Sequence, residues 1–163
     1  MLAGLAAVEP VVAIVDGAGV EVATWPGTPV VGVPRDTALA AALAALAALG
    51  GELGVVVPDD APDLPGLLVG KLFSALEDAA VSVLPAAGGG LVGLGARLPA
   101  PRWLGAALLD LDVVDAVEQL HAGAPVRSVV VGPGWHRLRL ATDVARLDPG
   151  LEGWDATRAL LSP

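Results

Sequence analysis

The chain has 163 residues, of which 55% are apolar and only 17% are charged, and its formal net charge is −9. This composition predicts one compact domain and excludes disorder, while the absence of cysteine excludes disulfides, thiolate nucleophiles and zinc held by cysteine. The acidic charge argues against a nucleic-acid partner, which is bound by clustered lysine and arginine, so a small-molecule site or a protein interface remains.

The first half of the chain predicts strands that alternate with helices. Val11–Val15 is a continuous apolar run rich in β-branched residues, which is typical of a strand buried on both faces. The elements expected after it are the strand Pro29–Val33, a helix from Thr37 to Leu49, the strand Leu53–Val57 and an amphipathic helix Leu64–Ala79.

The second half continues the alternation. Val81–Leu84 predicts a strand, and the five glycines of Pro85–Leu98 predict sharp turns or a close approach to a ligand or another chain. The remaining expected elements are helices at Trp103–Leu109 and Asp112–Ala122, strands at Val126–Val131 and Trp135–Leu140, and short helices at Thr142–Leu147 and Trp154–Leu161.

This order of elements predicts a single α/β domain over residues 1–163, a three-layer sandwich with a mainly parallel sheet. Ligands of such sheets bind beyond the carboxyl ends of the strands. The loop after Leu53–Val57 is therefore the expected site.

Targeting signals and membrane spans are not expected. Met1–Val8 holds no basic residue, unlike a secretory signal peptide, and the apolar run Ala38–Leu49 is shorter than the about 18 residues that cross a bilayer. These features predict a cytoplasmic protein with no membrane partner. Because charged residues are few, a homodimer is expected to cover apolar surface, with the tryptophans sealing the core or an interface. These are Trp25, Trp103, Trp135 and Trp154.

Several segments resemble the GT-A-type nucleotidyltransferases, or nucleotide-diphospho-sugar transferase superfamily. VVVPDDAPDLP, at Val55–Pro65, resembles the family's strand, acidic loop and helix start. Leu84–Gly95 resembles the glycine-bearing substrate segment of a glycosyltransferase-like subgroup, and Leu140–Val144 resembles a helix start near the family's C-terminal end. The superfamily includes molybdenum cofactor guanylyltransferases, so the resemblance implies a nucleotide or nucleotide-sugar partner and Mg²⁺ held by carboxylates.

The resemblance implies a metal role for Asp60, which by itself could hold a hydrated Mg²⁺ only weakly. The alternative is that Asp59, Asp60 and Asp63 cap the helix that follows them, where acidic residues are favoured.

The resemblance also implies substrate contacts. Gly88, Gly89 and Gly90 could lie against a sugar or nucleotide, or they could form only a bend. Arg137 and Arg139 alternate along one face of their segment and could grip a phosphate, or they could form a solvated face.

The chain also departs from the family pattern. The family's frequent Asp-Gly-Gly is Gly88–Gly90 here, and its Asp-x-Asp-like metal contribution falls on Arg137–Arg139. The usual first strand and phosphate loop would precede Met1, so the true start could lie upstream. Val11–Val15 is expected to close up beside Leu53–Val57; the alternative is that another chain supplies the pairing or covers the open strand edge. Two functions stay open: a binding or assembly protein with weak or no activity, and an Mg²⁺-dependent nucleotidyl- or glycosyl-transferase.

Overall fold

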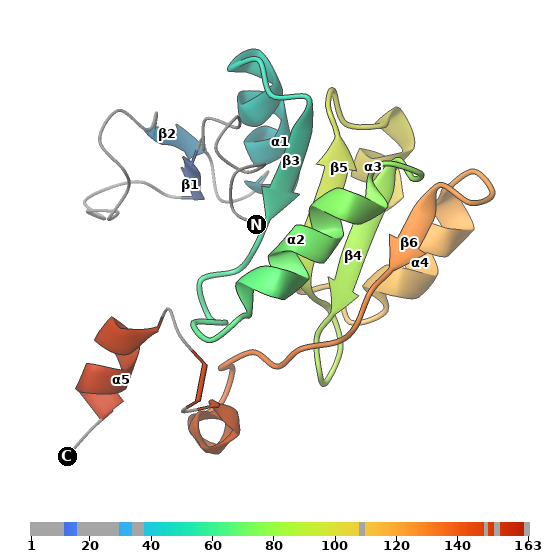
Figure 1. Ribbon diagram of the computed structural model, residues 1–163. Helices are drawn as coiled ribbons and strands as arrows, with labels where there is room; N and C mark the ends of the chain where they lie inside the picture. Colours follow the sequence, from blue (N-terminus) through green and yellow to red (C-terminus); the bar gives the residue numbers. More distant parts are fainter. Residues whose placement is uncertain are drawn as a thin grey trace.

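The structure is a computed structural model that describes residues 12–15, 30–33, 38–107, 110–148, 150–151 and 154–161. Its centre is a four-stranded sheet with the strand order β3-β5-β4-β6 (Figure 1). The strands are β3 (Leu53–Val56), β5 (Leu91–Arg97), β4 (Val81–Pro85) and β6 (Val129–Val131). In the described part of the chain, no helix is long and apolar enough to cross a membrane.

The sheet is mixed, which corrects the prediction of a mainly parallel one. β5 runs antiparallel to both of its neighbours, and only β4 and β6 pair in parallel. The prediction for Pro85–Leu98 is sharp turns or a close approach to a ligand or another chain, whereas half of this segment is the strand β5, buried from Leu91 to Ala96.

Two glycines, Gly93 and Gly95, allow the helix α2 (Gly66–Ala75) to pack closely on β5. A Cβ on Gly95 would lie 2.5 Å from Ser82 Oγ, and one on Gly93 would lie 2.9 Å from Leu72 Cδ1. Both glycines are on the side of β5 that faces α2, so their small size lets the helix pack directly on the strand. The alternation of glycine with apolar residues is thus a packing feature and not a sign of a loop.

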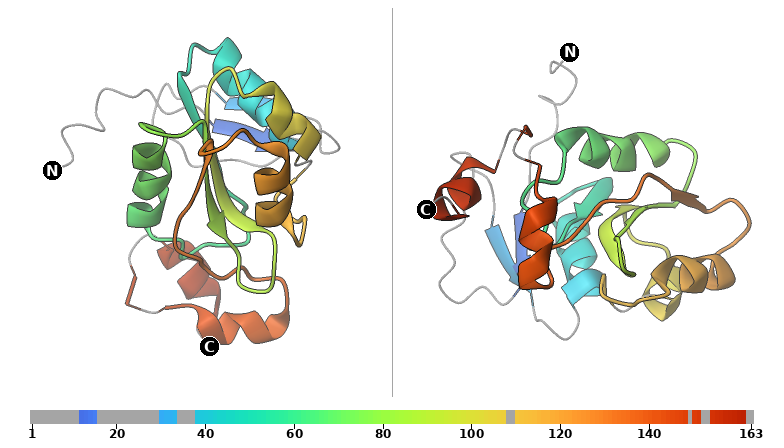
Figure 2. Two further views of the ribbon diagram at one scale, coloured as in Figure 1. Left: turned by 90° about the vertical axis from the view of Figure 1, so that its right-hand side faces the viewer. Right: turned by 90° about the horizontal axis from the view of Figure 1, so that it is seen from below.

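Helices cover both faces of the sheet (Figure 2). α2 packs on one face, where its Leu68 and Leu72 meet Leu84 and Val92 of the sheet. On the other face lie α1 (Ala38–Ala48), α3 (Arg102–Ala107) and α4 (Ala116–Gly123). Trp103 and Trp135 pack against these two apolar clusters and Trp154 is buried, so these three tryptophans seal the core as expected; Trp25 lies outside the described residues.

The expected neighbour of the first strand is wrong. β1 (Val12–Val15) pairs in parallel with β2 (Val30–Val33), and in the described residues β3 pairs with β5. The prediction did not count β5, whose ladder satisfies one edge of β3. A nearby strand of equal length, β2, provides the partner of β1.

Several other elements are shorter than expected. The segment Trp135–Leu140 is not a strand, because it makes only an isolated bridge between Trp135 and Ala86. It is followed by a 3-10 helix, Ala141–Arg146, and by α5 (Asp155–Leu161). β3, β4 and β6 point in the same direction, so the loops that leave their carboxyl ends gather at one end of the sheet, called its carboxyl end below.

Candidate functional site

Three loops meet at the carboxyl end of the sheet: residues 57–65 after β3, the turn 86–90 after β4 and the segment 132–140 after β6. Backbone hydrogen bonds join them directly. The Leu138 N–H donates to the Asp60 carbonyl at 2.7 Å, and the Ala87 N–H donates to the Trp135 carbonyl at 2.7 Å. Backbone hydrogen bonds thus connect the loops at the carboxyl end of the sheet, where the sequence predicted the site.

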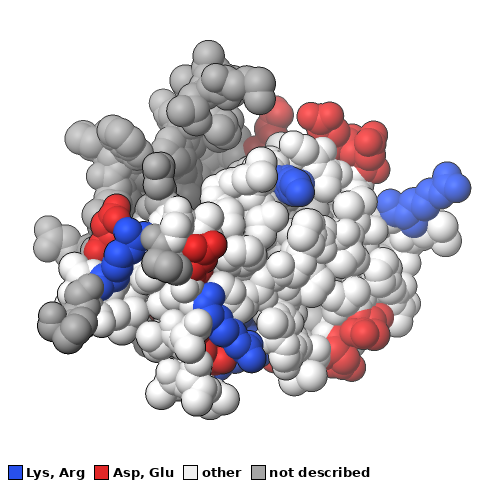
Figure 3. Space-filling model, turned by 60° about the horizontal axis from the view of Figure 1, so that its bottom comes forward, with Lys and Arg blue, Asp and Glu red and all other residues white. Residues whose placement is uncertain are grey.

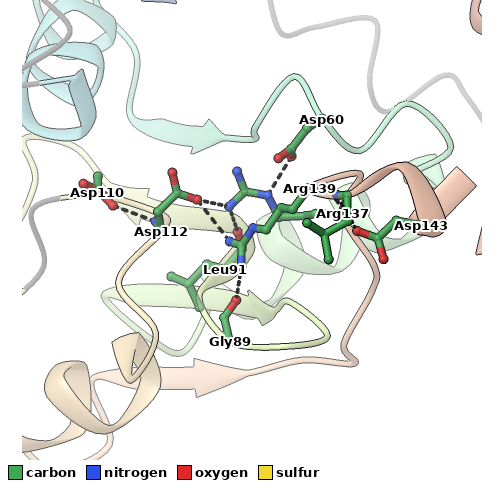
Figure 4. A network of polar contacts seen from close by, with 9 residues as sticks. Asp60, Gly89, Leu91, Asp110, Asp112, Arg137, Arg139 and Asp143 are labelled. Carbon is green, nitrogen blue, oxygen red and sulfur yellow. Dashed lines mark hydrogen bonds and ion pairs between the residues drawn. The ribbon is translucent and has the colours of Figure 1, made fainter.

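Arg137 lies at the centre of these loops and is 7% exposed (Figure 4). Its Nε donates to Asp60 Oδ1 at 2.6 Å, and its Nη1 donates to Asp112 Oδ1 at 2.7 Å and to the Leu91 carbonyl at 3.1 Å. One guanidinium thus links the loop after β3, the start of β5 and the segment before α4. The alternative of a solvated face is wrong for Arg137.

The electrostatic balance at Arg137 favours its charged form. Burial by itself lowers the pKa of the guanidinium, but the hydrogen bond and negative charge of Asp60, together with those of Asp112, outweigh burial and raise the pKa above its ordinary value. Arg137 is therefore a permanent positive charge inside the network.

Arg139 extends the network toward solvent, since its side chain is 31% exposed. Its Nη2 donates to Asp112 Oδ1 at 3.0 Å and its Nη1 donates to the Gly89 carbonyl at 2.9 Å. The Asp112 N–H in turn donates to Asp110 Oδ1 at 2.6 Å (Figure 4). Two arginines consequently share one carboxylate oxygen next to the glycine turn.

The three glycines of the turn have φ values of +91°, +102° and +77°, which favour glycine. A Cβ on Gly90 would lie 2.6 Å from the Leu111 carbonyl, and one on Gly89 would lie 2.9 Å from Val114 Cγ1. Gly89 and Gly90 therefore face the segment before α4, whereas a Cβ on Gly88 would meet nothing within 4 Å. The bend is real, and of these glycines Gly88 has open space beside it.

Asp63 forms a second polar cluster in the same loop. Its side chain is fully buried and accepts hydrogen bonds from Trp135 Nε1 at 3.3 Å and from the Asp148 N–H at 3.1 Å. His136 Nε2 lies 3.0 Å from its Oδ2. Asp63 thus holds the C-terminal segment against the loop that follows β3.

The structure brings together Asp60, the glycine turn, Arg137 and Arg139, which were singled out from the sequence. The capping alternative is wrong, because the N-cap of α2 is Pro65 and no side chain caps it. Sequence reasoning missed Asp112, which it placed at the start of a helix. α4 starts only at Ala116, which leaves the Asp-Leu-Asp segment free to meet the arginines.

The magnesium ion implied by the resemblance does not fit these donors. Among the residues that the structure describes, no group of three or more histidine, aspartate or glutamate side chains could hold a metal ion. Arg137 Nε lies 2.6 Å from Asp60 Oδ1, so a divalent cation bound to that carboxylate would face a like charge at close range. Arg137 has the position and charge that compete with a cation for Asp60.

Comparisons with known proteins place the fold. A structure search finds the crystal structure of a candidate nucleotide-diphospho-sugar transferase from Desulfovibrio desulfuricans G20, with a TM-score of 0.60 and 18% sequence identity. The alignment covers 97% of this chain and 77% of that chain. The two proteins share a fold. No protein-family model matches the sequence, and a search of curated proteins finds no significant match.

The shared fold confirms the α/β architecture that the sequence resemblance implied. The finer subgroup, with its relation to molybdenum cofactor guanylyltransferases, stays a prediction, as does the location of the protein in the cell.

Proposed function

We propose that the chain is a nucleotidyltransferase-like domain that acts as a binding or assembly protein and carries out weak or no transfer. The bond from Arg137 Nε to Asp60 Oδ1, at 2.6 Å, is the observation that carries this proposal. Through this bond Asp60, the carboxylate expected to hold Mg²⁺, is instead paired with the buried guanidinium of Arg137.

Transfer of a phosphoryl or glycosyl group needs charge stabilisation at the leaving phosphate, which a divalent cation usually supplies. Arg137 is poorly placed to substitute for that ion. It is 7% exposed, and its Nε and Nη1 already donate to acceptors of the protein. These bonds commit two of its three nitrogens to the protein.

Arg139 supports the binding role. Its partly exposed guanidinium lies beside the glycine turn, where it could donate a charge-assisted hydrogen bond to the phosphate of a nucleotide or nucleotide-sugar. Asp112, 69% exposed at the side chain, offsets part of its charge. We therefore expect such binding to be weak and independent of magnesium.

The proposal is tested by thermal denaturation with CTP, GTP and UDP-glucose, each with and without Mg²⁺. We expect Mg²⁺ to add no stabilisation, in wild type and in Asp60→Asn alike, and ³¹P NMR to show no turnover. Asp59→Asn is the matched control, because Asp59 is the exposed neighbour of Asp60 in the same loop.

The alternative is an Mg²⁺-dependent transferase, since Asp60 is 25% exposed at the side chain and could accept an ion if Arg137 moved. Nucleotide with Mg²⁺ would then raise the melting temperature through ligand binding to the folded state. If that rise occurs, is lost in Asp60→Asn and persists in Asp59→Asn, the binding proposal is wrong and the transferase is supported.

A further inference from the structure

The outer edge of the sheet is formed by β6, three consecutive valines with no charged residue among them. In the described part of the chain, β4 is the strand with which β6 pairs (Figure 1). Val130 and Val131 are 39% and 41% exposed. Edge strands are usually protected by short length, charged side chains, proline or a covering element, because an open edge recruits another strand. β6 is short, but none of its three residues is charged or proline.

The ladder register shows which backbone groups are open. The Val81 N–H donates to the Ser128 carbonyl at 3.0 Å, and the Gly132 N–H donates to the Val83 carbonyl at 2.8 Å. In a parallel ladder, alternate residues turn both polar groups to the same neighbour. The N–H and C=O groups of Val129 and Val131 therefore point away from β4.

An apolar groove runs beside this edge on the α2 side of the sheet. It has a volume of about 190 Å³, and its lining includes Leu72, Ala75, Leu84, Val130 and Gly132, with Lys71 at its side. Charged side chains are sparse on the surface in general, as the largely uncharged face in Figure 3 shows. A partner at the β6 edge would cover part of this apolar surface.

We propose that two copies of this chain pair through β6, antiparallel and across a two-fold axis at Val130. Val129 of one copy would then exchange both backbone hydrogen bonds with Val131 of the partner subunit, and the symmetry repeats this exchange, which gives four bonds. The two sheets become one continuous sheet. The open groups on Val129 and Val131 make the edge complementary to itself.

The charges at the two ends of β6 favour this antiparallel arrangement. Arg127 is exposed just before β6 and has a left-handed φ of 63°. The Gly90 N–H donates to the Val114 carbonyl at 3.1 Å, so the first turn of α4, with exposed Asp115 and Glu118, lies toward the carboxyl end of β4 and of its parallel neighbour β6. In an antiparallel pair, Arg127 approaches the acidic end of the partner's α4, whereas a parallel pair would place like charges together.

The first test is the mass in solution, measured by light scattering after size-exclusion chromatography. We expect twice the 16.1 kDa chain mass for wild type and one chain mass for Val131→Pro. Proline at residue 131 removes an outward N–H and leaves the bonds to β4 intact, so circular dichroism should show a folded monomer. A monomeric wild type at high concentration, or a folded Val131→Pro that stays dimeric, overturns the proposal.

A disulfide test fixes the register and does not depend on the proline variant. The chain has no cysteine, so Val130→Cys introduces a single thiol at the axis, where the opposed Cα atoms would be about 4.5 Å apart, within disulfide range. We expect mild oxidation to give a covalent dimer. Val126→Cys is the control, since Val126 is 92% exposed but lies well away from the axis. Equal cross-linking of both variants contradicts the register.

A charge reversal tests the orientation. Arg127→Glu should weaken the dimer at least several-fold at low salt, and the double change Arg127→Glu with Glu118→Arg should restore it. Failure of the second change to restore pairing would contradict the antiparallel arrangement.

Discussion

Replacement of Arg137 by methionine tests whether the buried network holds the site together. Methionine keeps most of the apolar stem and removes the three hydrogen bonds to Asp60, Asp112 and the Leu91 carbonyl. The bond to Asp60 is worth about 2 kcal/mol as a charged pair that is mostly sheltered. The pair with Asp112 is worth at most about 0.5 kcal/mol, because that carboxylate is 69% exposed at the side chain.

Loss of the donor to the Leu91 carbonyl adds about 1 kcal/mol. The expected loss of unfolding free energy is therefore about 3 kcal/mol, which corresponds to a fall in melting temperature of about 6–12 °C for a chain of this size. Urea denaturation followed by tryptophan fluorescence measures it, with the loss seen as a lower midpoint at an unchanged slope.

Arg139→Met is the matched control, because this side chain shares Asp112 with Arg137 but is 31% exposed. We expect it to cost about 1 kcal/mol or less. A double-mutant cycle between Arg137→Met and Asp60→Asn should give a coupling of about 1 kcal/mol. If Arg137→Met costs no more than Arg139→Met, or if the coupling is zero, the network does not stabilise the fold as argued.

Three further predictions concern the loops at the carboxyl end of the sheet. Gly90→Ala should destabilise the fold by about 3 kcal/mol, because φ is positive there and the new Cβ would lie 2.6 Å from the Leu111 carbonyl oxygen. Gly88→Ala has open space beside the new Cβ and should cost only about 1 kcal/mol, so equal urea midpoints for the two variants would contradict this prediction. Asp63→Ala should cost about 2 kcal/mol, because it leaves two partly buried donors, Trp135 Nε1 and the Asp148 N–H, without their acceptor. Hydrogen exchange of the C-terminal segment should rise, and unchanged exchange would rule out the holding role. Folding raises the pKa of Arg137, so its contribution to the free energy of unfolding is complete below the unfolded pKa and is lost only as pH rises through the folded pKa. The difference in unfolding free energy between wild type and Arg137→Met should therefore stay constant from about pH 6 to about pH 10.

Much of the local structure follows from short stretches of sequence. Apolar runs predicted β1, β3 and β4 within a residue or two, and the strand β2 likewise. The glycines at residues 88–90 predicted a bend, and all three have positive φ. These features depend on backbone preference and on the burial of neighbouring residues, which the sequence expresses directly.

The strand β5 shows where pattern alone misleads. Its two glycines suggested turns, yet each is needed because α2 packs where a side chain would stand. The segment 135–140 shows the opposite error, because its alternation resembled a strand while its side chains serve the Asp60 and Asp63 clusters.

The sequence by itself determined an α/β domain and placed acidic, glycine-rich and arginine-bearing segments after successive strands. The tertiary structure alone decided that β5 makes the sheet mixed and that Arg137 is buried against Asp60. The physical reason is separation along the chain: Asp60 and Arg137 are 77 residues apart, and Asp112 and Arg137 are 25 apart. Local preference does not encode such pairs, because an arginine is either a solvated charge or a buried cation according to which carboxylates the fold brings within hydrogen-bond distance of it.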